Sequence, residues 1–331
     1  MIKRLLKDKF GRCIEDVRIS ITDRCNFRCI YCLPEDEFAK TSKSEILSYD
    51  EIERLARLLV NLGVKKIRVT GGEPLLRRDV EVLIGKLAAI EELQDLAMTS
   101  NGFLLADKCD ALAQAGLKRL NLSMDSLKPA KFALLTGRDA LERVFNSIDA
   151  AVRAGFFPIK INCVVMRGVN DDEIVDFAEF AHRTGHTVRF IEFMPLDSGH
   201  SWKRDMVVPG REVFHKINAH RKLIQLPQRS NAETARRYTF EDGRGEIGII
   251  APVTMPFCGH CNRIRLTADG KIRTCLFSLV EHDVKKLLRS GASDEDLAEF
   301  LFAVVEQKEE RHHINDPDFV QPARTMSCIG G

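Results

Sequence analysis

Short β-rich runs alternate with amphipathic helical segments over most of the first two hundred residues. The clearest helical segment follows Ser48, which forms a predicted capping box with Glu51. Ile52, Leu55 and Leu59 then recur at helical spacing on one face. Strict alternation of strand and helix predicts parallel strands joined by right-handed crossovers. The expected strands are 17–22, 66–70, 96–101, 119–125, 158–166 and 187–194.

One face of at least five of these strands is polar. In the first strand Arg18, Ser20 and Thr22 alternate with apolar residues, and successive side chains of a strand point to opposite faces. An antiparallel sheet with one wet face would give the same alternation, but the intervening helices favour a barrel whose polar face lines the lumen. Such a lumen predicts a sizeable charged ligand. The other polar positions are Arg68, Thr70, Thr99, Asn101, Asn121, Ser123, Asp125, Lys160 and Asn162.

Six strand–helix units predict an α/β fold with an incomplete (βα)6 barrel of the TIM type. After Pro195 the pattern breaks into a linker or lid loop, and a smaller α+β extension follows. A hairpin is expected there, with strands 263–267 and 271–274. The predicted division is a barrel core at 1–200, a C-terminal domain at 201–320 and a tail at 321–331.

Composition narrows the class of protein. The chain has 331 residues, of which 44% are apolar and 30% charged, as in ordinary globular proteins. A net charge of +2 predicts neither a protein that coats nucleic acid nor a chain with an acidic tail. No apolar run is long enough for a bilayer and the start lacks a signal peptide's apolar stretch, which predicts a cytoplasmic protein without a membrane. Ten cysteines in such a compartment indicate metal rather than disulfides.

The strongest motif is a C-x3-C-x2-C run, Cys25, Cys29 and Cys32, directly after the first strand. Three thiolates can hold three irons of a 4Fe–4S cluster and leave the fourth iron open to the amino and carboxylate groups of a methionine moiety. A reduced cluster there can cleave a bound sulfonium and release an adenosyl radical. Zinc is the alternative, but zinc sites usually close four ligands. The spacing resembles the signature of radical S-adenosylmethionine (SAM) enzymes.

A second set of cysteines lies near the end of the chain: Cys258, Cys261 and Cys275. The predicted hairpin brings Cys261 and Cys275 together. A zinc knot that also uses His260 is the alternative, although His260 adjoins Cys261 and neighbouring residues rarely bind one tetrahedral ion. The preferred interpretation is a second 4Fe–4S cluster whose open iron is available to a substrate.

Arg263 and Arg265 are two apart on a predicted strand, so both guanidinium groups project to one side. The planar guanidinium group of arginine can donate two parallel hydrogen bonds to phosphate oxygens or to the edge of a purine. Two solvated arginines on a hairpin are the plainer alternative. Together with Arg18, Arg68 and Lys160 in the lumen, they predict a site that neutralises a triphosphate.

These motifs, with the terminal Gly-Gly, resemble the radical SAM family of GTP 3′,8-cyclases of molybdenum-cofactor biosynthesis over essentially the whole chain. The resemblance implies two 4Fe–4S clusters and a tail, with Gly330 and Gly331, that reaches into the active site. A core tyrosine, a capping serine and a core methionine stay open as alternatives for three of the implied SAM contacts. The implied SAM contacts are Tyr31, Gly72 (within Gly71-Gly72-Glu73-Pro74), Ser123 and Met194. The implied GTP contacts are Arg18, Arg68, Thr99, Lys160, Arg263 and Arg265.

The resemblance also implies the reaction. An adenosyl radical removes a ribose hydrogen from GTP, and the sugar radical adds to C8 to give (8S)-3′,8-cyclo-7,8-dihydroguanosine 5′-triphosphate. No protein side chain is predicted as a catalytic base. Expected partners are GTP, a flavodoxin- or ferredoxin-like electron donor and the downstream cyclic pyranopterin monophosphate synthase, and no nucleic acid. A monomer and a homodimer both stay open.

Two other functions fit part of the pattern. A peptide-modifying radical SAM enzyme commonly has more C-terminal cysteines, and a non-catalytic iron–sulfur carrier needs no polar lumen. The remaining cysteines, Cys13, Cys109, Cys163 and Cys328, lack metal spacing and are expected to be structural. The pair at 312–313, both histidines, is expected to be solvated surface.

Overall fold

The computed structural model describes residues 4–33, 41–197 and 201–330. Its strands form one sheet in the order β12-β11-β10-β1-β2-β3-β4-β5-β6-β9-β8-β7. The strands are β1 (Asp16–Ser20), β2 (Lys66–Thr70), β3 (Asp95–Ser100), β4 (Arg119–Ser123), β5 (Lys160–Val165), β6 (Thr187–Glu192), β7 (Leu223–Gln225), β8 (Arg236–Phe240), β9 (Glu246–Ile250), β10 (Arg263–Leu266), β11 (Lys271–Arg273) and β12 (His282–Asp283). The helices are α1 (Tyr49–Asn61), α2 (Val80–Ala88), α3 (Cys109–Gln114), α4 (Pro129–Thr136), α5 (Leu141–Arg153), α6 (Ile174–Thr184), α7 (Gly210–His220), α8 (Val284–Arg289), α9 (Asp294–Glu306) and α10 (Met326–Ile329).

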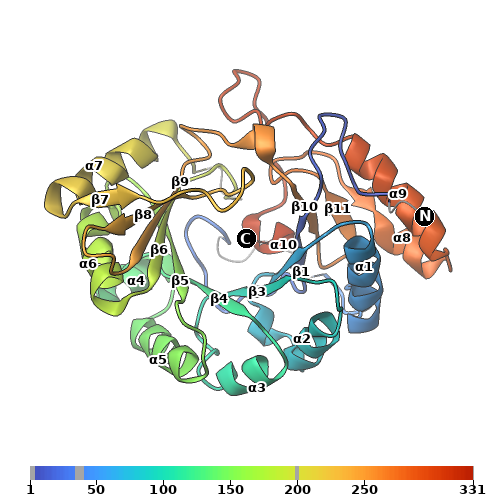
Figure 1. Cartoon of the computed structure of the whole chain (residues 1–331), viewed down its shortest axis with the longest axis horizontal. Helices are drawn as coiled ribbons and strands as arrows, with labels where there is room; N and C mark the ends of the chain where they lie inside the picture. Colours follow the sequence, from blue (N-terminus) through green and yellow to red (C-terminus); the bar gives the residue numbers. More distant parts are fainter. Residues whose placement is uncertain (1–3, 34–40, 198–200, 331) are drawn as a thin grey trace.

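The six predicted strands are present as β1 to β6, parallel and in sequence order. The sheet curves into an open ring with helices on its outer side (Figure 1). Because β12 and β7 are edge strands and do not pair with each other, the barrel is incomplete, as predicted.

The C-terminal part of the chain continues this sheet at both edges. Strand β10 pairs in parallel with β1, and β9 pairs in parallel with β6, which the sequence did not predict. The expected hairpin is β10 with β11, which pair antiparallel. Since strands from both sides of residue 200 share one sheet, the boundary between core and C-terminal domain stays a prediction.

The outward face of the sheet is apolar and packs under the helices. Ile19, Val69 and Ile161 are fully buried in one continuous core with helix residues such as Leu55. Each such side chain contributes roughly 1.5–3 kcal/mol of hydrophobic stabilisation. The polar residues between them therefore face the lumen, as the alternation predicts.

The predicted capping box begins α1. The amide of Glu51 donates to Ser48 Oγ at 3.1 Å, and the amide of Ser48 donates to Glu51 Oε2 at 2.6 Å. The reciprocal bonds satisfy two amides that a helix start otherwise leaves without partners. They fix the start of α1 at the predicted residue.

The C-terminal tail lies inside the ring (Figure 1). Within the predicted tail at 321–331, residues Met326–Ile329 form the short helix α10, and Ile329 is fully buried. Gly331 lies outside the described residues. The tail is therefore a packed part of the lumen up to Gly330.

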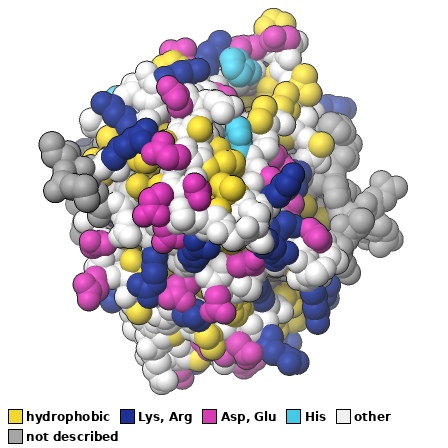
Figure 2. Space-filling model, turned by 90° about the vertical axis from the view of Figure 1, so that its right-hand side faces the viewer, with side chains coloured by type: hydrophobic (Ala, Val, Ile, Leu, Met, Phe, Trp, Pro, Cys, Tyr) yellow, Lys and Arg dark blue, Asp and Glu magenta, His cyan; other side chains and the backbone are white. Residues whose placement is uncertain are grey.

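The surface carries charges of both signs. On the side of α8 and α9, Lys and Arg side chains are interspersed with Asp and Glu (Figure 2). Of the helices in the described ranges, none combines the length and the apolar character that crossing a bilayer requires.

Candidate functional site

Two cavities lie at opposite ends of the lumen. The first is at the carboxyl ends of the strands, where barrel enzymes place their active sites. Its walls come from the loops after β1, β2, β3 and β4, and from the tail. The residues that line it include Cys25, Cys29, Tyr31, Cys32, Gly71, Gly72, Thr99, Asn101, Ser123, Asp125, Met326 and Ser327.

Aromatic packing holds the cysteine-bearing loop in place. Phe27 is buried and meets Phe103 and Phe132 edge-on, with ring centroids 6.0 and 5.9 Å apart. The amide of Arg28 donates to the Thr136 carbonyl at 2.7 Å, at the end of α4. A residue between the first two cysteines thus anchors the loop to the core, and the thiols are left facing the cavity.

The three thiols share one buried environment. Burial, and then the neighbouring Cys25 and Cys328, raise the pKa of Cys32 to about 12. Burial and then Cys32 raise the pKa of Cys29 in the same way. Asn101 Nδ2 and the Phe27 amide donate to Cys25 Sγ at 3.8 and 3.4 Å.

The three buried thiols would repel one another as thiolates. A cluster of positively charged iron centres offsets both this repulsion and the cost of burying the charges. No trio of His, Cys, Asp or Glu within the described ranges has the geometry of a site for a single metal ion. Of the other cysteines, Cys109 and Cys163 are buried in the main core, as expected, whereas Cys328 lies beside Cys32.

Glycine is required where the loop after β2 meets the cysteine loop. A Cβ on Gly71 would lie 2.7 Å from the Thr22 carbonyl oxygen, and one on Gly72 would lie 2.6 Å from the Arg24 carbonyl carbon. The amide of Gly72 donates to Thr22 O at 2.7 Å. This close backbone approach places both glycines on the cavity wall.

Glu73 fixes the same loop through hydrogen bonds to residues at the end of β3. Its buried carboxylate accepts hydrogen bonds from the Asn101 amide at 2.7 Å and from Ser100 Oγ at 2.9 Å. Burial raises its pKa to about 7, against the effect of these bonds. The loop after β2 is thus tied to the end of β3.

Tyr31 and Ser123 line the first cavity, whereas Met194 packs outside it. The phenol of Tyr31 donates to Asp125 Oδ2 at 2.5 Å. Burial raises the pKa of Asp125 to about 6, although this bond and one from the Val164 amide lower it. Met194 contacts the apolar cluster around Leu196.

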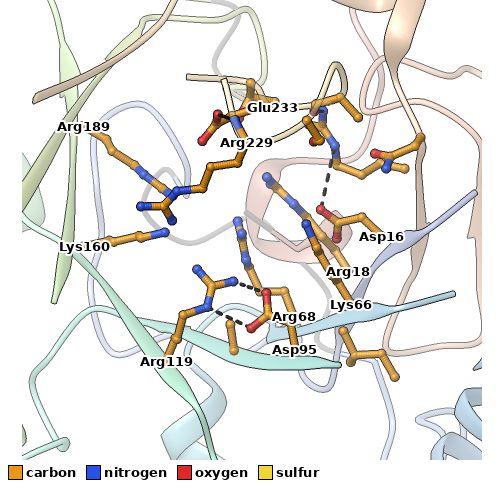
Figure 3. Close-up of a pocket in the computed structure, with 17 residues that line it drawn as sticks. Asp16, Arg18, Lys66, Arg68, Asp95, Arg119, Lys160, Arg189, Arg229 and Glu233 are labelled. Carbon is orange, nitrogen blue, oxygen red and sulfur yellow. Dashed lines mark hydrogen bonds and ion pairs between the residues drawn. The ribbon is translucent and has the colours of Figure 1, made fainter. Parts of the chain in front are cut away.

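The second cavity opens at the amino ends of the strands and has a volume of about 310 Å³. Cations from β1, β2, β4, β5 and β6 converge on it, and Arg229 joins them from the segment between β7 and β8 (Figure 3). Three acids, Asp16, Asp95 and Glu233, also line it. The cations are Arg18, Lys66, Arg68, Arg119, Lys160, Arg189, Arg229 and Arg263.

Strand register places these cations side by side. Arg18 lies opposite both Arg68 and Arg265 on the neighbouring strands. Burial lowers the pKa of Arg18, and the charges of Arg265 and Arg68 lower it further. Burial and then Arg189 lower the pKa of Lys160 to about 7. The cavity therefore holds positive charge that its three acids do not balance.

Several polar atoms of the lumen make no hydrogen bond with the residues that the structure describes. These orphaned atoms include Arg18 Nε, Arg68 Nε, Thr99 Oγ1, Asn121 Oδ1 and Asn162 Oδ1. An unpaired buried polar group costs about 1–3 kcal/mol. A polar anionic ligand in the lumen would relieve both the unpaired atoms and the repulsion between cations.

Sequence reasoning missed four cations of this cavity: Lys66, Arg119, Arg189 and Arg229. The first three lie on the inward face of predicted strands, so the alternation contained the signal. Arg119 forms a bidentate ion pair with Asp95, which neutralises part of its charge. Arg229 lies in an irregular segment and had no sequence signal.

The tail lines the first cavity and contacts one of the predicted GTP residues, Arg265. Arg265 is buried and donates to the carbonyl of Gly330 and, at 3.4 Å, to that of Ile329. A Cβ on Gly330 would overlap Thr70 Oγ1. Arg265 therefore faces the tail rather than the basic cavity, and Thr99 lines the first cavity.

The second cysteine set lies at the start of β10 and after β11. Cys258 and Cys261 flank a single helical turn, and Cys275 follows the hairpin. Burial raises the pKa of Cys261, but the positive charges of Lys308 and Arg263 outweigh it and lower the pKa. His260, the extra ligand of the zinc alternative, is exposed.

Lys308 supports this arrangement. Its buried ammonium donates to the carbonyl of Arg263 at 2.9 Å and to that of Thr274. These bonds connect the segment after α9 to both strands of the hairpin. A cation is thus fixed beside thiols that need a positive neighbour to ionise.

Family models match both parts of the chain. The model of the Radical SAM superfamily matches residues 19–181, and the model named Molybdenum Cofactor Synthesis C matches residues 186–314. Together they span the barrel and most of its C-terminal continuation.

Curated relatives are similar over nearly the full length. A protein of Rhodopirellula baltica named GTP 3′,8-cyclase is 47% identical over 330 residues, which are 98% of this chain and 92% of the relative. A mitochondrial GTP 3′,8-cyclase of Arabidopsis thaliana is 46% identical over 331 residues, which are 100% of this chain and 84% of the relative.

Among solved structures, Streptococcus suis SuiB bound to S-adenosylmethionine has a TM-score of 0.63 at 14% identity. The match covers 89% of this chain and 69% of that one. It supports the fold alone.

Proposed function

The chain belongs to the GTP 3′,8-cyclase family, and we propose that its two cavities divide the reaction between radical formation and binding of GTP. It is a radical SAM enzyme of the first step of molybdenum-cofactor biosynthesis, with SAM and an iron–sulfur cluster as cofactors and GTP as substrate. The residue roles below are proposals.

We assign the first cavity to the cofactors. Cys25, Cys29 and Cys32 would hold a 4Fe–4S cluster with one open iron. When bound, the reduced cluster and SAM supply an adenosyl radical. Gly71 and Gly72 leave room for a ligand against the backbone. Tyr31, Gly72 and Ser123 line this cavity and would hold SAM, whereas Met194, the fourth expected contact, packs outside it.

We assign the second cavity to the triphosphate. Its unbalanced cations are the observation that carries the proposal, because a bound polyanion would offset the repulsion between them. The triphosphate at the amino ends of the strands would direct the ribose up the lumen, toward the first cavity. The residues are Arg18, Arg68, Lys160 and Arg263, with Lys66, Arg119, Arg189 and Arg229 added by the structure.

The middle of the lumen would hold the sugar and base. Thr99 and Arg265 lie there, and the tail ending in Gly330 forms a wall. The ribose of GTP loses a hydrogen atom, its radical adds to C8, and one electron and one proton complete the product. No side chain of this chain is assigned as the base.

A second 4Fe–4S cluster on Cys258, Cys261 and Cys275 is part of the proposal. Lys308 and Arg263 supply positive charge beside Cys261, which favours the thiolate form that binds iron. Its open iron would face the guanine. We also propose the 201–320 region as the domain that carries this cluster, and cytoplasmic partners: a flavodoxin- or ferredoxin-like donor and cyclic pyranopterin monophosphate synthase.

The test is an anaerobic incubation of purified protein with SAM, dithionite and GTP. We expect 5′-deoxyadenosine and the 3′,8-cyclised nucleotide in comparable amounts. A double variant Arg18→Ala, Arg68→Ala removes cations of the second cavity and should lose GTP binding while iron content is kept. Arg4→Ala, at an exposed surface pair, is the control. Unchanged GTP affinity in the double variant would contradict the assignment.

A further inference from the structure

His312 is buried next to the second cysteine set, contrary to the expectation of solvated surface. Only 8% of the residue is exposed, and neither ring nitrogen has a hydrogen-bond partner among the described residues. His313, the next residue, is exposed and pairs with Asp316 at 2.6 Å. The expectation was wrong for His312 alone, because packing from distant segments buries it.

Three observations place His312 near Cys258 and Cys275. Burial raises the pKa of Cys258, and the backbone amide of His312, which faces that sulfur, lowers it. His312 lines the same surface cavity as Cys275. The ring also packs edge-on against Phe277, with centroids 5.5 Å apart.

Neither ring nitrogen of His312 has a hydrogen-bond partner in the described part of the chain, although the ring packs against Phe277. Burial lowers the pKa of the ring, and the nearby backbone of Pro252 and of His312 itself raises it, but neither contact has the geometry of a hydrogen bond. A buried imidazole always has at least one N–H to donate. Leaving such a donor unpaired costs about 1–3 kcal/mol. An acceptor near Cys258 and Cys275 would remove this cost.

We propose that His312 is a positioning residue of the second iron–sulfur cluster, and that its ring N–H donates a hydrogen bond to a sulfur on the Cys275 side. This inference rests on the second cluster of the proposed function. Hydrogen bonds to the sulfurs of a cluster stabilise its reduced, more negative form and raise its reduction potential. His312 thus makes the second cluster easier to reduce without occupying its open iron.

The test compares His312→Phe, which keeps the ring and removes the donor, with His312→Gln, which keeps an N–H donor. His313→Phe is the matched control at the neighbouring exposed position. Iron content and the reduction potential of the second cluster are measured on the anaerobic holoenzyme by potentiometric titration with electron paramagnetic resonance detection. Thermal unfolding checks that each variant is folded.

We expect about eight irons per chain in all four proteins, as two 4Fe–4S clusters require. The second cluster of His312→Phe should have a lower potential, that of His312→Gln a partly restored one, and that of His313→Phe the wild-type value. An unchanged potential in His312→Phe overturns the inference and leaves the second cluster standing.

Two other outcomes also overturn it. Loss of about four irons in both His312 variants, with a strong hyperfine coupling to ¹⁵N-labelled histidine in the wild type, would make His312 an iron ligand. Only about four irons in the wild type would remove the second cluster itself, and the proposed role of His312 with it.

Discussion

Arg265 on β10 donates a hydrogen bond to the carbonyl of Gly330, the last described residue of the chain. The same arginine lies opposite Arg18 across the parallel pair of β1 and β10. One side chain therefore connects the tail to the basic lumen. The position of the tail and the charge of the lumen are coupled, and substitutions in the tail should change how GTP reacts.

Gly330→Ala should impair cyclisation more than radical formation. The backbone at Gly330 has φ +79°, and a Cβ would overlap Thr70 Oγ1. A strained backbone of this kind costs about 1–3 kcal/mol, which corresponds to a roughly 5- to 150-fold loss of product yield. The measurement is the ratio of cyclised nucleotide to 5′-deoxyadenosine. Gly291→Ala is the control, since its φ is +85° but nothing lies within 4 Å. Equal ratios in both variants would refute the role of the tail.

Arg324→Ala should loosen the packing of the C-terminal tail, because Arg324 connects the tail to Asp269 and Glu281. Arg324 donates to both carboxylate oxygens of Asp269, at 2.8 and 2.7 Å, and lies 2.9 Å from Glu281. The half-buried bidentate pair is stronger than a surface ion pair. We expect a several-fold loss of the cyclised nucleotide at unchanged iron content, with partial recovery in Arg324→Lys. Full activity in Arg324→Ala would show that other contacts suffice.

Cys25→Ser should abolish 5′-deoxyadenosine formation while the chain still folds. The anchoring contacts of its loop come from Phe27 and Arg28 rather than from the thiol. Circular dichroism and an anaerobic assay check the two halves of this expectation. Cys13→Ser, at a cysteine outside both sets, should leave the assay unchanged. Retained cyclisation in Cys25→Ser would exclude the assigned cluster.

GTP affinity should fall as the pH rises above 7. Burial and neighbouring arginines lower the pKa of Lys160 to about 7. A bound triphosphate favours the charged form and raises this pKa, so binding takes up a proton above pH 7. One proton makes the dissociation constant rise by up to about tenfold per pH unit. Calorimetric titrations between about pH 6 and pH 8.5 measure this.

Lys160→Arg provides the control for this pH dependence, because a guanidinium keeps its charge across the range. Its affinity profile should be flat where that of the wild type slopes. A flat wild-type profile with no proton uptake would show that Lys160 does not contact the phosphates.

Local patterns predicted the barrel because strand alternation has a period of two residues. That period identified Arg18, Arg68 and Lys160, and the same reasoning applied to the strand at 187–194 would have identified Arg189. The pairing of β9 and β10 with the barrel depends on residues far apart in sequence, so no local pattern contained it.

The burial of His312 was not predictable from local sequence. Its neighbours in sequence are charged or polar, which predicts exposure, but Phe277 and Pro252 pack around it from other segments. Cys258, Cys261 and Cys275 were predictable from spacing. The position of His312 beside these cysteines was not predictable in this way.

The order of strands in the sheet also sets an order of events during synthesis. Strand β1 is among the first to leave the ribosome, yet one of its two neighbours, β10, is made only when most of the chain exists. Long-range pairing of this kind slows folding and leaves an unpaired edge in the nascent chain. The half-made barrel therefore exposes the edge of β1, which needs protection from aggregation until β10 is made in the last quarter of translation.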